Sequence, residues 1–255
     1  MIPFFGQDTV QFLGISFRVW GFFVGCAYAL GTFLAYRRAK QKGLNAEQVL
    51  SLATWIFFGV MIGARLFHVF VYEPGYYLAE PWEAVDPRAP GFSMMGGLLG
   101  ALAVFLWRAR SAKLDLLAYA DVLIWGVPFG CGVGRIGCFL IHDHPGTLTS
   151  SLLGVQYPDG QVRHDLGLYL SIAGFLMGAI FLALDKKPRK KGFFVAMYLL
   201  LEGFSRVWLD MFRIADTRYA GFTPAQWLGA VFVLVGGAWL GQLVLKERNE
   251  YSASI

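Results

Sequence analysis

Residues 130–146 read GCGVGRIGCFLIHDHPG, and they join the end of a long apolar stretch to a short polar one. Together with the residues before it, the apolar part is long enough to cross a bilayer as a helix. Arg135 lies within this part, where a guanidinium costs about 2.5–3.5 kcal/mol on insertion scales. An arginine in such a place predicts a function, and binding an anion is the function that fits its charge.

The composition assigns the whole chain to the membrane. Hydrophobic residues make up 56% of it and charged residues 15%, against about 25% charged in soluble domains. We therefore expect an all-α, polytopic membrane protein with one integral domain over residues 1–255. Residues 1–10 hold no Lys or Arg, so we expect the first span to be retained rather than cleaved as a signal peptide. The seven expected spans are 12–35, 48–72, 94–107, 115–141, 166–184, 192–213 and 225–245, the third beginning with an irregular segment around 91–97.

The basic residues set the orientation. Of the 22 Lys and Arg residues, 14, including every Lys, fall in one set of loops, at 37–42, 108–113, 186–191 and 246–248. These loops are expected to be cytoplasmic, because positive charge accumulates on that side. Seven spans then place the N-terminus outside and the C-terminus in the cytoplasm, with residues 142–165 as a small extracytoplasmic cap. The net charge of +5 follows from this topology, and no nucleic-acid partner is expected.

The fourth span carries its charged residues on one face. Asp121, Pro128, Arg135 and His142 recur at steps of seven. We expect Asp121, near the inner end, to pack between helices. Arg135 is expected to face the interior of the bundle, because charges within a membrane avoid lipid.

The sixth span has a second charged face, formed by Glu202, Arg206, Asp210 and Arg213 at steps of four, four and three. Alternating charges at this spacing permit pairing from Glu202 through Arg206 to Asp210, and paired charges are cheaper to bury than a lone one. A self-satisfied polar seam between helices is one interpretation. The alternative is that Arg206 and Arg135 together give the outer half of the bundle a surplus of positive charge.

Two more arginines lie within the expected spans. Arg65 is midway along the second span, and Arg18 is in the outer half of the first, where snorkelling to the interface is the alternative. Guanidinium groups match phosphate through paired hydrogen bonds. The sequence therefore predicts an arginine-lined cavity for a phospholipid head group, open toward the outer leaflet.

The polar residues after the fourth span allow three interpretations. His142 and His144 flank Asp143, and they could share a metal, act in acid–base catalysis, or form an ordinary turn. No further ligand set lies nearby in the sequence, so no metal and no cofactor is expected. His164 ends the cap on the same side. The cysteines, Cys26, Cys131 and Cys138, are expected to be small buried apolar residues rather than nucleophiles.

Two glycine-rich motifs resemble signatures of one family. Residues 134–137, GRIG, and residues 96–100, GGLLG, are similar to the Gly-Arg-Ile-Gly and His-Gly-Gly-Leu-Leu-Gly segments of the bacterial prolipoprotein diacylglyceryl transferases. Seven spans with an outside N-terminus also agree with that family. Further matches keep their order along the chain, namely Arg65, Arg206 with Asp210 and Arg213, His164 with Tyr169, and Gln226.

The resemblance implies an enzyme of lipoprotein biosynthesis in the bacterial cytoplasmic (inner) membrane. Such an enzyme transfers the diacylglyceryl group of phosphatidylglycerol to the lipobox cysteine thiol of a prolipoprotein and releases glycerol phosphate. It needs no cofactor, and its partners are phosphatidylglycerol, the lipobox peptide and membrane lipids. Arg135 and Arg206 are then expected to be catalytic. Substrate-binding residues are expected at Arg18, Arg65, Gly96, Gly97, Gly134, Glu202, Asp210, Arg213 and Gln226.

Several positions depart from the family's pattern, among them the segment His142-Asp143-His144, which replaces an Asn-Gly-Glu. The histidine before Gly-Gly is Met95, whose thioether takes up no proton. The asparagine after Arg-Ile-Gly is Cys138, a tyrosine of the first span is Trp20, and Glu202 stands in place of another tyrosine. The groups around the phosphate are therefore kept, while donors and acceptors around the reacting atoms have changed.

A replacement for the missing histidine is available in this chain. We expect His142, His144 or His164, with Asp143 beside them, to serve as the general base. Two alternatives stay open: a paralogue that only binds phospholipid or modifies a different acceptor, and a transporter of an anionic amphiphile.

Overall fold

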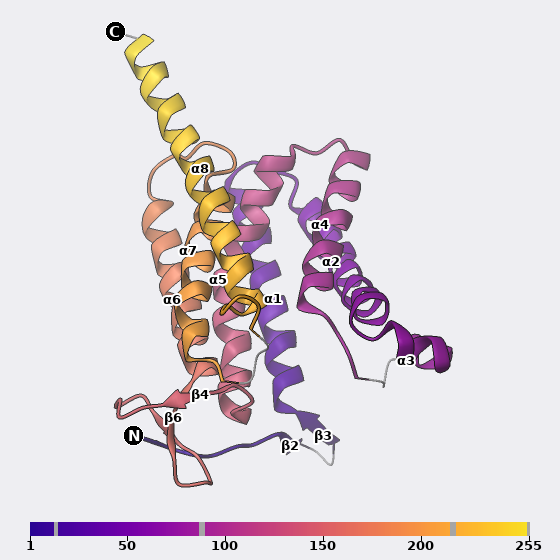
Figure 1. The fold of residues 1–255 in the computed structure, drawn as a ribbon. Coiled ribbons are helices and arrows are strands. Elements are labelled where there is room, and N and C mark those ends of the chain that lie inside the picture. Colours follow the sequence, from indigo (N-terminus) through magenta and orange to yellow (C-terminus); the bar gives the residue numbers. More distant parts are fainter. Residues whose placement is uncertain (13–14, 87–89, 215–217, 254–255) are drawn as a thin grey trace. The chain divides into compact units, whose positions relative to one another are not determined.

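The computed structural model describes residues 1–12, 15–86, 90–214 and 218–253 (Figure 1). The chain divides into two compact units, each with its own packing. The first consists of Met1–Ala35 and Ala120–Ile255, and the second is Tyr36–Tyr119. The single integral domain expected from the sequence stays a prediction.

The first unit is built on long helices that pack around an aromatic core. Trp125, Met177, Phe181 and Phe194 are its buried centre. Its helices are α5 (Leu116–Ile141), α6 (Leu166–Leu184), α7 (Phe193–Leu209), α8 (Pro224–Ala253) and most of α1 (Val19–Gln41).

Glycines let neighbouring helices of this unit approach by their backbones. A Cβ atom on Gly174 of α6 would lie 2.7 Å from the backbone nitrogen of Gly132 in α5. A Cβ atom on Gly203 of α7 would lie 2.5 Å from the carbonyl oxygen of Gly229 in α8. Small residues at such crossings are typical of membrane helix packing, and here they bring α5 against α6 and α7 against α8.

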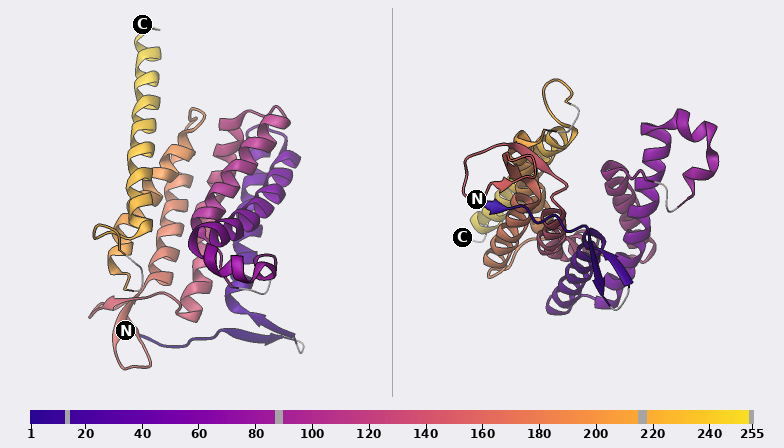
Figure 2. Two further views of the ribbon diagram at one scale, coloured as in Figure 1. Left: turned by 45° about the vertical axis from the view of Figure 1, so that its right-hand side comes forward. Right: turned by 90° about the horizontal axis from the view of Figure 1, so that it is seen from below.

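The segment expected as a cap folds into a small sheet, so the all-α expectation is wrong for this segment. Its strands are in the order β1-β5-β6-β4, with β1 parallel to β5 and the other pairs antiparallel. The sheet lies where α5 ends and α6 begins, and the N-terminal strand completes it (Figures 1 and 2). Pairing gives the backbone groups of this segment partners that a loop would lack. The strands are β1 (Ile2–Pro3), β4 (Pro145–Leu148), β5 (Val155–Gln156) and β6 (Val162–Asp165).

The first helix begins later than the expected span of 12–35. Strands β2 (Thr9–Phe12) and β3 (Ile15–Arg18) form an antiparallel hairpin, and α1 begins at Val19. Apolar and polar residues alternate along both strands, which favours a strand over a helix. Hydropathy averaged over a window does not detect this two-residue alternation. Arg18 therefore lies at the end of a strand rather than within a span.

The second unit pairs α2 (Ala46–Phe67) with α4 (Met94–Ser111). A Cβ atom on Gly63 of α2 would lie 2.4 Å from the carbonyl oxygen of Gly96, so the two backbones are in contact. Short helical segments join them: a π-helix (His68–Tyr72), α3 (Pro74–Ala79) and a 3-10 helix (Pro81–Ala84). The irregular start expected around 91–97 ends at Ser93, whose side chain caps α4, so the expectation is wrong for 94–97.

The chain is a membrane protein. Five helical segments of the described residues are long and apolar enough to cross a bilayer: Val19–Gln41, Ala46–Tyr72, Leu116–Ile141, Leu166–Leu184 and Pro224–Asn249. The other two expected spans, 94–107 and 192–213, correspond to α4 and α7, which are helices of 18 and 17 residues. All seven predicted ranges thus contain a long helix, and the number that spans stays a prediction.

Candidate active site

A small pocket of the first unit brings Arg135 of α5 together with Arg206 of α7. Its volume is about 60 Å³, and Tyr198, Glu202 and Ser205 are among its other lining residues. Both arginines thus line one pocket, and its use as a phospholipid site stays a prediction. Pockets that enclose a whole small ligand measure about 300–1,000 Å³. This pocket therefore has room for a small polar group and not for an entire lipid.

Arg135 is held at the pocket with most of its hydrogen-bonding capacity unused. Its Nη1 atom lies 3.7 Å from Sγ of Cys138, one helical turn further along α5. Within the described part of the chain, this sulfur is the guanidinium's sole hydrogen-bond acceptor. A guanidinium has five N–H donors, and a thiol sulfur is a weak acceptor. Arg135 is therefore a donor group prepared for a ligand.

Arg206 is bound by one carboxylate and keeps a face for a ligand. Its Nε donates to Oε1 of Glu202 at 2.7 Å, and the two side chains are 18% and 16% exposed. The pocket then holds two guanidinium charges against one carboxylate, an excess of one positive charge. The buried hydroxyl of Ser205, also in the pocket, has no partner among the described residues. A buried unsatisfied hydroxyl is costly, and a bound anion would satisfy it.

The predicted ladder along the sixth span is only half formed. The pair of Glu202 with Arg206 is confirmed, but α7 ends at Leu209 and Asp210 belongs to a 3-10 turn. Asp210 is buried, where it accepts a hydrogen bond from Oγ1 of Thr223 at 2.6 Å and lies 3.3 Å from Nε of Arg213. The side chain of Asp210 is thus bound by Thr223 and Arg213 rather than by Arg206, so the extension of the ladder to Asp210 is wrong.

Gln226 is committed to the start of α8. The backbone nitrogen of Thr223 donates to Oε1 of Gln226 at 3.0 Å, and that of Gln226 donates to Oγ1 of Thr223 at 3.1 Å. This reciprocal pair is a capping box. The amide of Gln226 also donates to the carbonyl of Val207 at 3.1 Å, which ties α8 to α7. These contacts give Gln226 a structural role, and its predicted contact with substrate stays untested.

Arg65, in the second unit, has its donors occupied by the chain itself. Its guanidinium donates to the carbonyl oxygens of Ala84 at 3.0 Å, Pro90 at 2.7 Å and Gly91 at 3.0 Å. It also donates to the carbonyl of Glu83. Few donors are left for a phosphate. Arg65 therefore holds the segment between α2 and α4, in contrast to Arg135, and we do not retain it in the phosphate site.

The other substrate-binding residues expected from the resemblance have local structural contacts. A Cβ atom on Gly134 would lie 3.3 Å from Cβ of Ala27 in α1, and one on Gly97 would lie 3.4 Å from Cγ1 of Val60 in α2. Gly96 is at the backbone crossing of α2 with α4. Arg18 is exposed and lies opposite Thr9 in the hairpin. The glycines set helix spacing, and their contact with substrate stays a prediction.

His142 is sealed inside the first unit. Its Nδ1 lies 2.7 Å from Oδ2 of Asp165, and both side chains are 0% exposed. The rings of Phe4 and Phe5 lie 4.7 and 4.6 Å from the imidazole. No incoming thiol can reach this ring in the observed conformation. The burial of His142 therefore argues against its predicted role as the general base.

Asp165 is the residue of this region that the sequence analysis missed. It binds His142, accepts from the hydroxyl of Tyr157 at 3.1 Å, and caps α6 through the backbone nitrogen of Leu168 at 3.0 Å. Burial and this neighbouring carboxylate raise the pKa of Tyr157. An aspartate directly before an apolar run is a helix-start signal, which could have identified the cap but not its partners.

Asp143 and His144 lie on the other side of the same turn. His142 has φ +52°, which turns the chain so that these neighbours leave its cage. His144 contacts Asp143 directly, and their side chains are 26% and 32% exposed. Ligand atoms of His144, Asp143 and Cys138 all lie within 4.8 Å of one another. Through Cys138 this group adjoins Arg135, so His144 is the predicted histidine that is both accessible and next to the pocket.

His164 is placed with its predicted motif partner. Its Nδ1 lies 2.7 Å from the hydroxyl oxygen of Tyr169, and the ring centroid of Phe212 is 4.5 Å away. Burial lowers the pKa of His164. The histidine is therefore neutral near pH 7 and hydrogen-bonded through one of its two ring nitrogens.

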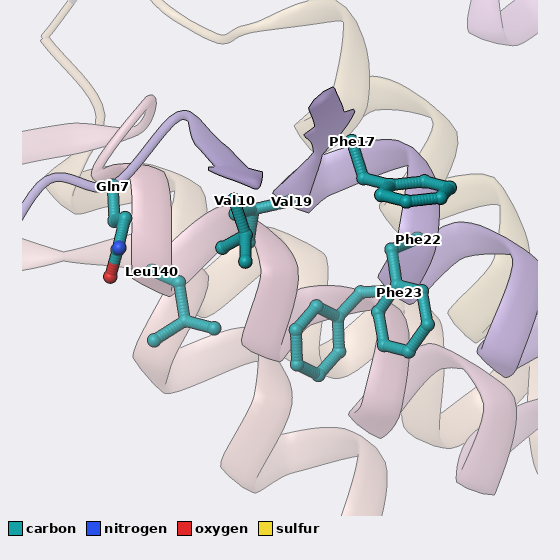
Figure 3. Close-up of a pocket in the computed structure, with 7 residues that line it drawn as sticks. All are labelled: Gln7, Val10, Phe17, Val19, Phe22, Phe23 and Leu140. Atoms are coloured by element: carbon teal, nitrogen blue, oxygen red, sulfur yellow. The ribbon is translucent and has the colours of Figure 1, made fainter. Parts of the chain in front are cut away.

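A larger, apolar cavity lies between the hairpin, α1 and the end of α5. Its volume is about 410 Å³, which falls in the range of small-ligand sites. Figure 3 shows Leu140 of α5 on one side and the rings of Phe22 and Phe23 of α1 on the other. The remaining lining residues are Gln7, Val10, Phe17 and Val19. The cavity is suited to a hydrocarbon group.

Fold and site together define a helical membrane protein with a small polar pocket lined by two arginines and a separate apolar cavity. A model of the prolipoprotein diacylglyceryl transferase family matches residues 7–241. The chain is 31% identical to the phosphatidylglycerol–prolipoprotein diacylglyceryl transferase of Roseobacter denitrificans, over 89% of this chain and 88% of that protein. It is 31% identical to the enzyme of the same name from Nitrosomonas europaea, over 93% and 90%. Identity to the Bordetella parapertussis enzyme is 32%, over 83% and 87%. The chain belongs to the prolipoprotein diacylglyceryl transferase family.

Proposed function

We propose that this chain transfers the diacylglyceryl group of phosphatidylglycerol to the lipobox cysteine thiol of a prolipoprotein and releases glycerol phosphate. Family membership and the names of the relatives support this reaction. The observation that carries it is the single pocket lined by Arg135 and Arg206. This pocket takes the phosphate of the lipid.

The charge of the pocket suits a phosphodiester. Two guanidinium groups and Glu202 leave one positive charge in excess, and a phosphodiester carries one negative charge. The unused N–H groups of Arg135 offer the paired hydrogen bonds that phosphate accepts. The hydroxyl of Ser205 adds a third donor. The arginines thus bind the substrate by charge and by geometry.

The same groups assist the reaction. The lipobox sulfur attacks carbon 3 of the glyceryl group, and the bond from that carbon to the phosphate oxygen breaks. The electron pair of that bond leaves with glycerol phosphate, so negative charge grows on the phosphate in the transition state. Fixed donors aimed at developing charge are among the largest contributions to catalysis. Arg135 and Arg206 fill that role here.

An acyl chain of the lipid occupies the apolar cavity. Leu140, on the same helix as Arg135, lines this cavity, so one helix presents both the phosphate ligand and part of the hydrocarbon site. The small volume of the arginine pocket supports this division, since it holds a head group and no more. Each part of the lipid then meets a surface of matching polarity.

Activation of the thiol takes place at Asp143 and His144. A thiolate is the nucleophile, and Met95 stands where the family has a histidine. His142 is sealed against Asp165, whereas Asp143 and His144 are partly exposed and adjoin Arg135 through Cys138. This end of α5 is therefore where a thiol proton is lost.

The topology completes the proposal. The seven long helices span the bacterial inner membrane, with the N-terminus outside and the Lys-bearing loops and C-terminus in the cytoplasm. Residues 142–165 then lie on the outer side. The end of α5 that carries Arg135 faces the same side, where it meets the prolipoprotein.

The test is direct. The purified protein, in nanodiscs that contain phosphatidylglycerol, is incubated with a lipobox peptide, and the products are followed by mass spectrometry. We expect the diacylglyceryl adduct on the peptide, its loss in Arg135→Gln, and its retention in Arg163→Gln. Arg163 is a matched control, because it pairs with Asp159 at the surface of the cap. No adduct from a folded preparation that binds the lipid would overturn the proposal, and lipid flux without an adduct would favour a transporter.

A further inference from the structure

We propose that Cys138, Asp143 and His144 bind a zinc ion whose fourth position takes the thiolate of the lipobox cysteine. The inference rests on the proposed transferase function and deepens it, because it says how the incoming thiol is activated. It also reverses the expectation, drawn from sequence, that no metal is bound.

The donor set is one that zinc uses. Thiolate sulfur, carboxylate oxygen and imidazole nitrogen are its usual protein ligands, and catalytic sites hold three of them and leave a fourth position open. The three ligand atoms lie within 4.8 Å of one another. Around tetrahedral zinc, ligand atoms are separated by about 3.5 Å. Side-chain movements of roughly one ångström therefore close the site.

Burial differs across the cluster in a way that suits a substrate position. Cys138 is buried, with 4% exposure, whereas the side chains of His144 and Asp143 are 26% and 32% exposed. An ion held by this set would have protein on the cysteine side and an accessible side toward the other two ligands. An incoming peptide thiol can approach from there.

The charges of the site nearly cancel once the substrate thiolate is bound. Zinc carries two positive charges, and the thiolate of Cys138, the carboxylate of Asp143 and the substrate thiolate carry three negative ones. The site then carries one net negative charge, and the guanidinium of Arg135, which is shared with the phosphate, lies 3.7 Å from the sulfur of Cys138.

The ion would deprotonate the incoming thiol, for which the chain has no histidine base at Met95. A free cysteine thiol has a pKa of about 8.5, so only about 3% is thiolate at pH 7. A thiol bound to zinc is deprotonated outright, which raises the thiolate fraction about 30-fold at pH 7. The displaced proton passes to solvent water. The zinc-bound sulfur then forms its bond to carbon 3 of the glyceryl group, and the electron pair of the broken carbon–oxygen bond leaves with glycerol phosphate.

The ligand set differs from the one that sequence spacing suggested. His142 and His144 are the histidines two residues apart, but His142 is bound to Asp165 in its aromatic cage. Cys138 takes its place, because it lies at the end of α5 and faces the turn. Cys138 is also a position where the chain departs from the family's asparagine, as is Met95. One departure removes a base, and the other supplies a metal ligand.

Metal binding is tested first, without reference to activity. The full-length protein is stripped with chelator, loaded with Zn²⁺ or Co²⁺, and its metal content and optical spectrum are measured. We expect one ion per chain and a thiolate-to-cobalt charge-transfer band for the wild type. The matched control Cys26→Ser should keep both, and Cys138→Ser and His144→Ala should lose them. A wild type without a stoichiometric ion, or an unchanged spectrum in Cys138→Ser, overturns the proposal.

The substrate position is tested next. A lipobox peptide added to the Co²⁺ form should strengthen the charge-transfer band, and the same peptide with serine in place of cysteine should not. Chelation should lower the transfer rate at pH 7 about 30-fold, with recovery on adding Zn²⁺. Full transfer by the metal-free protein overturns the zinc proposal and leaves the transferase function standing. Metal binding with no transfer under any condition overturns the transferase function and, with it, the catalytic use of the ion.

Discussion

Replacing Arg135 by lysine separates the shape of the guanidinium from its charge. The guanidinium has one weak protein acceptor, the sulfur of Cys138 at 3.7 Å, so its remaining donors serve the ligand. Lysine keeps the positive charge but replaces the planar fork by a point donor. Loss of about one charge-assisted hydrogen bond costs about 1.5–3 kcal/mol. That range corresponds to a fall in kcat/KM of about 10- to 150-fold. Glutamine, which also removes the charge, should cost about 10²- to 10³-fold, as loss of an oxyanion donor does.

The assay is transfer from phosphatidylglycerol in nanodiscs to a fluorescent lipobox peptide, with folding checked by circular dichroism. Arg163→Lys is the matched control, since this partly exposed arginine pairs with Asp159 outside the pocket, and its rate should equal that of the wild type. A wild-type rate for Arg135→Lys, or an equal loss in both variants, would refute the assignment of Arg135 to the phosphate.

Three further predictions concern stability and protonation. Asp165→Asn removes a buried charge that accepts from three donors and should lower the free energy of unfolding by about 3 kcal/mol. Asp159→Asn, at the surface, should lower it by less than about 1 kcal/mol. Equal effects of the two variants in thermal unfolding would contradict this prediction. The pKa of His164, followed by NMR, should lie below its ordinary value of 6.5, because burial disfavours the imidazolium. As the pH falls below 6.5, the imidazole of the unfolded chain takes up a proton before that of the folded chain, so the free energy of unfolding should drop. A measured pKa of His164 at or above 6.5 would contradict its burial in the folded protein. Gly63→Ala places a Cβ atom 2.4 Å from a carbonyl oxygen of α4 and should cost about 1–3 kcal/mol, whereas Gly75→Ala, with open space around it, should be neutral in the same melting experiment.

Features that depend on local sequence were predictable. The span expected at 166–184 is helix α6, Leu166–Leu184, because its apolar run has clear ends. The pair of Glu202 with Arg206 followed from helical spacing. The first span was misplaced since average hydropathy does not separate an alternating hairpin from the start of a helix. Asp210 binds Thr223 and Arg213 rather than Arg206, which spacing along one helix does not reveal.

Features that depend on distant partners were not predictable. Arg65 and Arg135 looked alike in sequence as arginines within expected spans. The carbonyl oxygens that occupy Arg65 come from residues 18 to 26 positions away. His142 and His144 also looked equivalent, but a positive φ at His142 sends one ring into an aromatic cage and leaves the other partly exposed. Which donors are already occupied was therefore decided by the fold.

The central claim is that Arg135 and Arg206 hold one phosphate, and a cryo-EM structure of the protein in phosphatidylglycerol nanodiscs tests it most directly. The account predicts density for a phosphate within hydrogen-bonding distance of both guanidinium groups, with an acyl chain in the cavity beside Leu140. A head group resolved at Arg65 or Arg18, with the pocket between α5 and α7 holding only water, would contradict it.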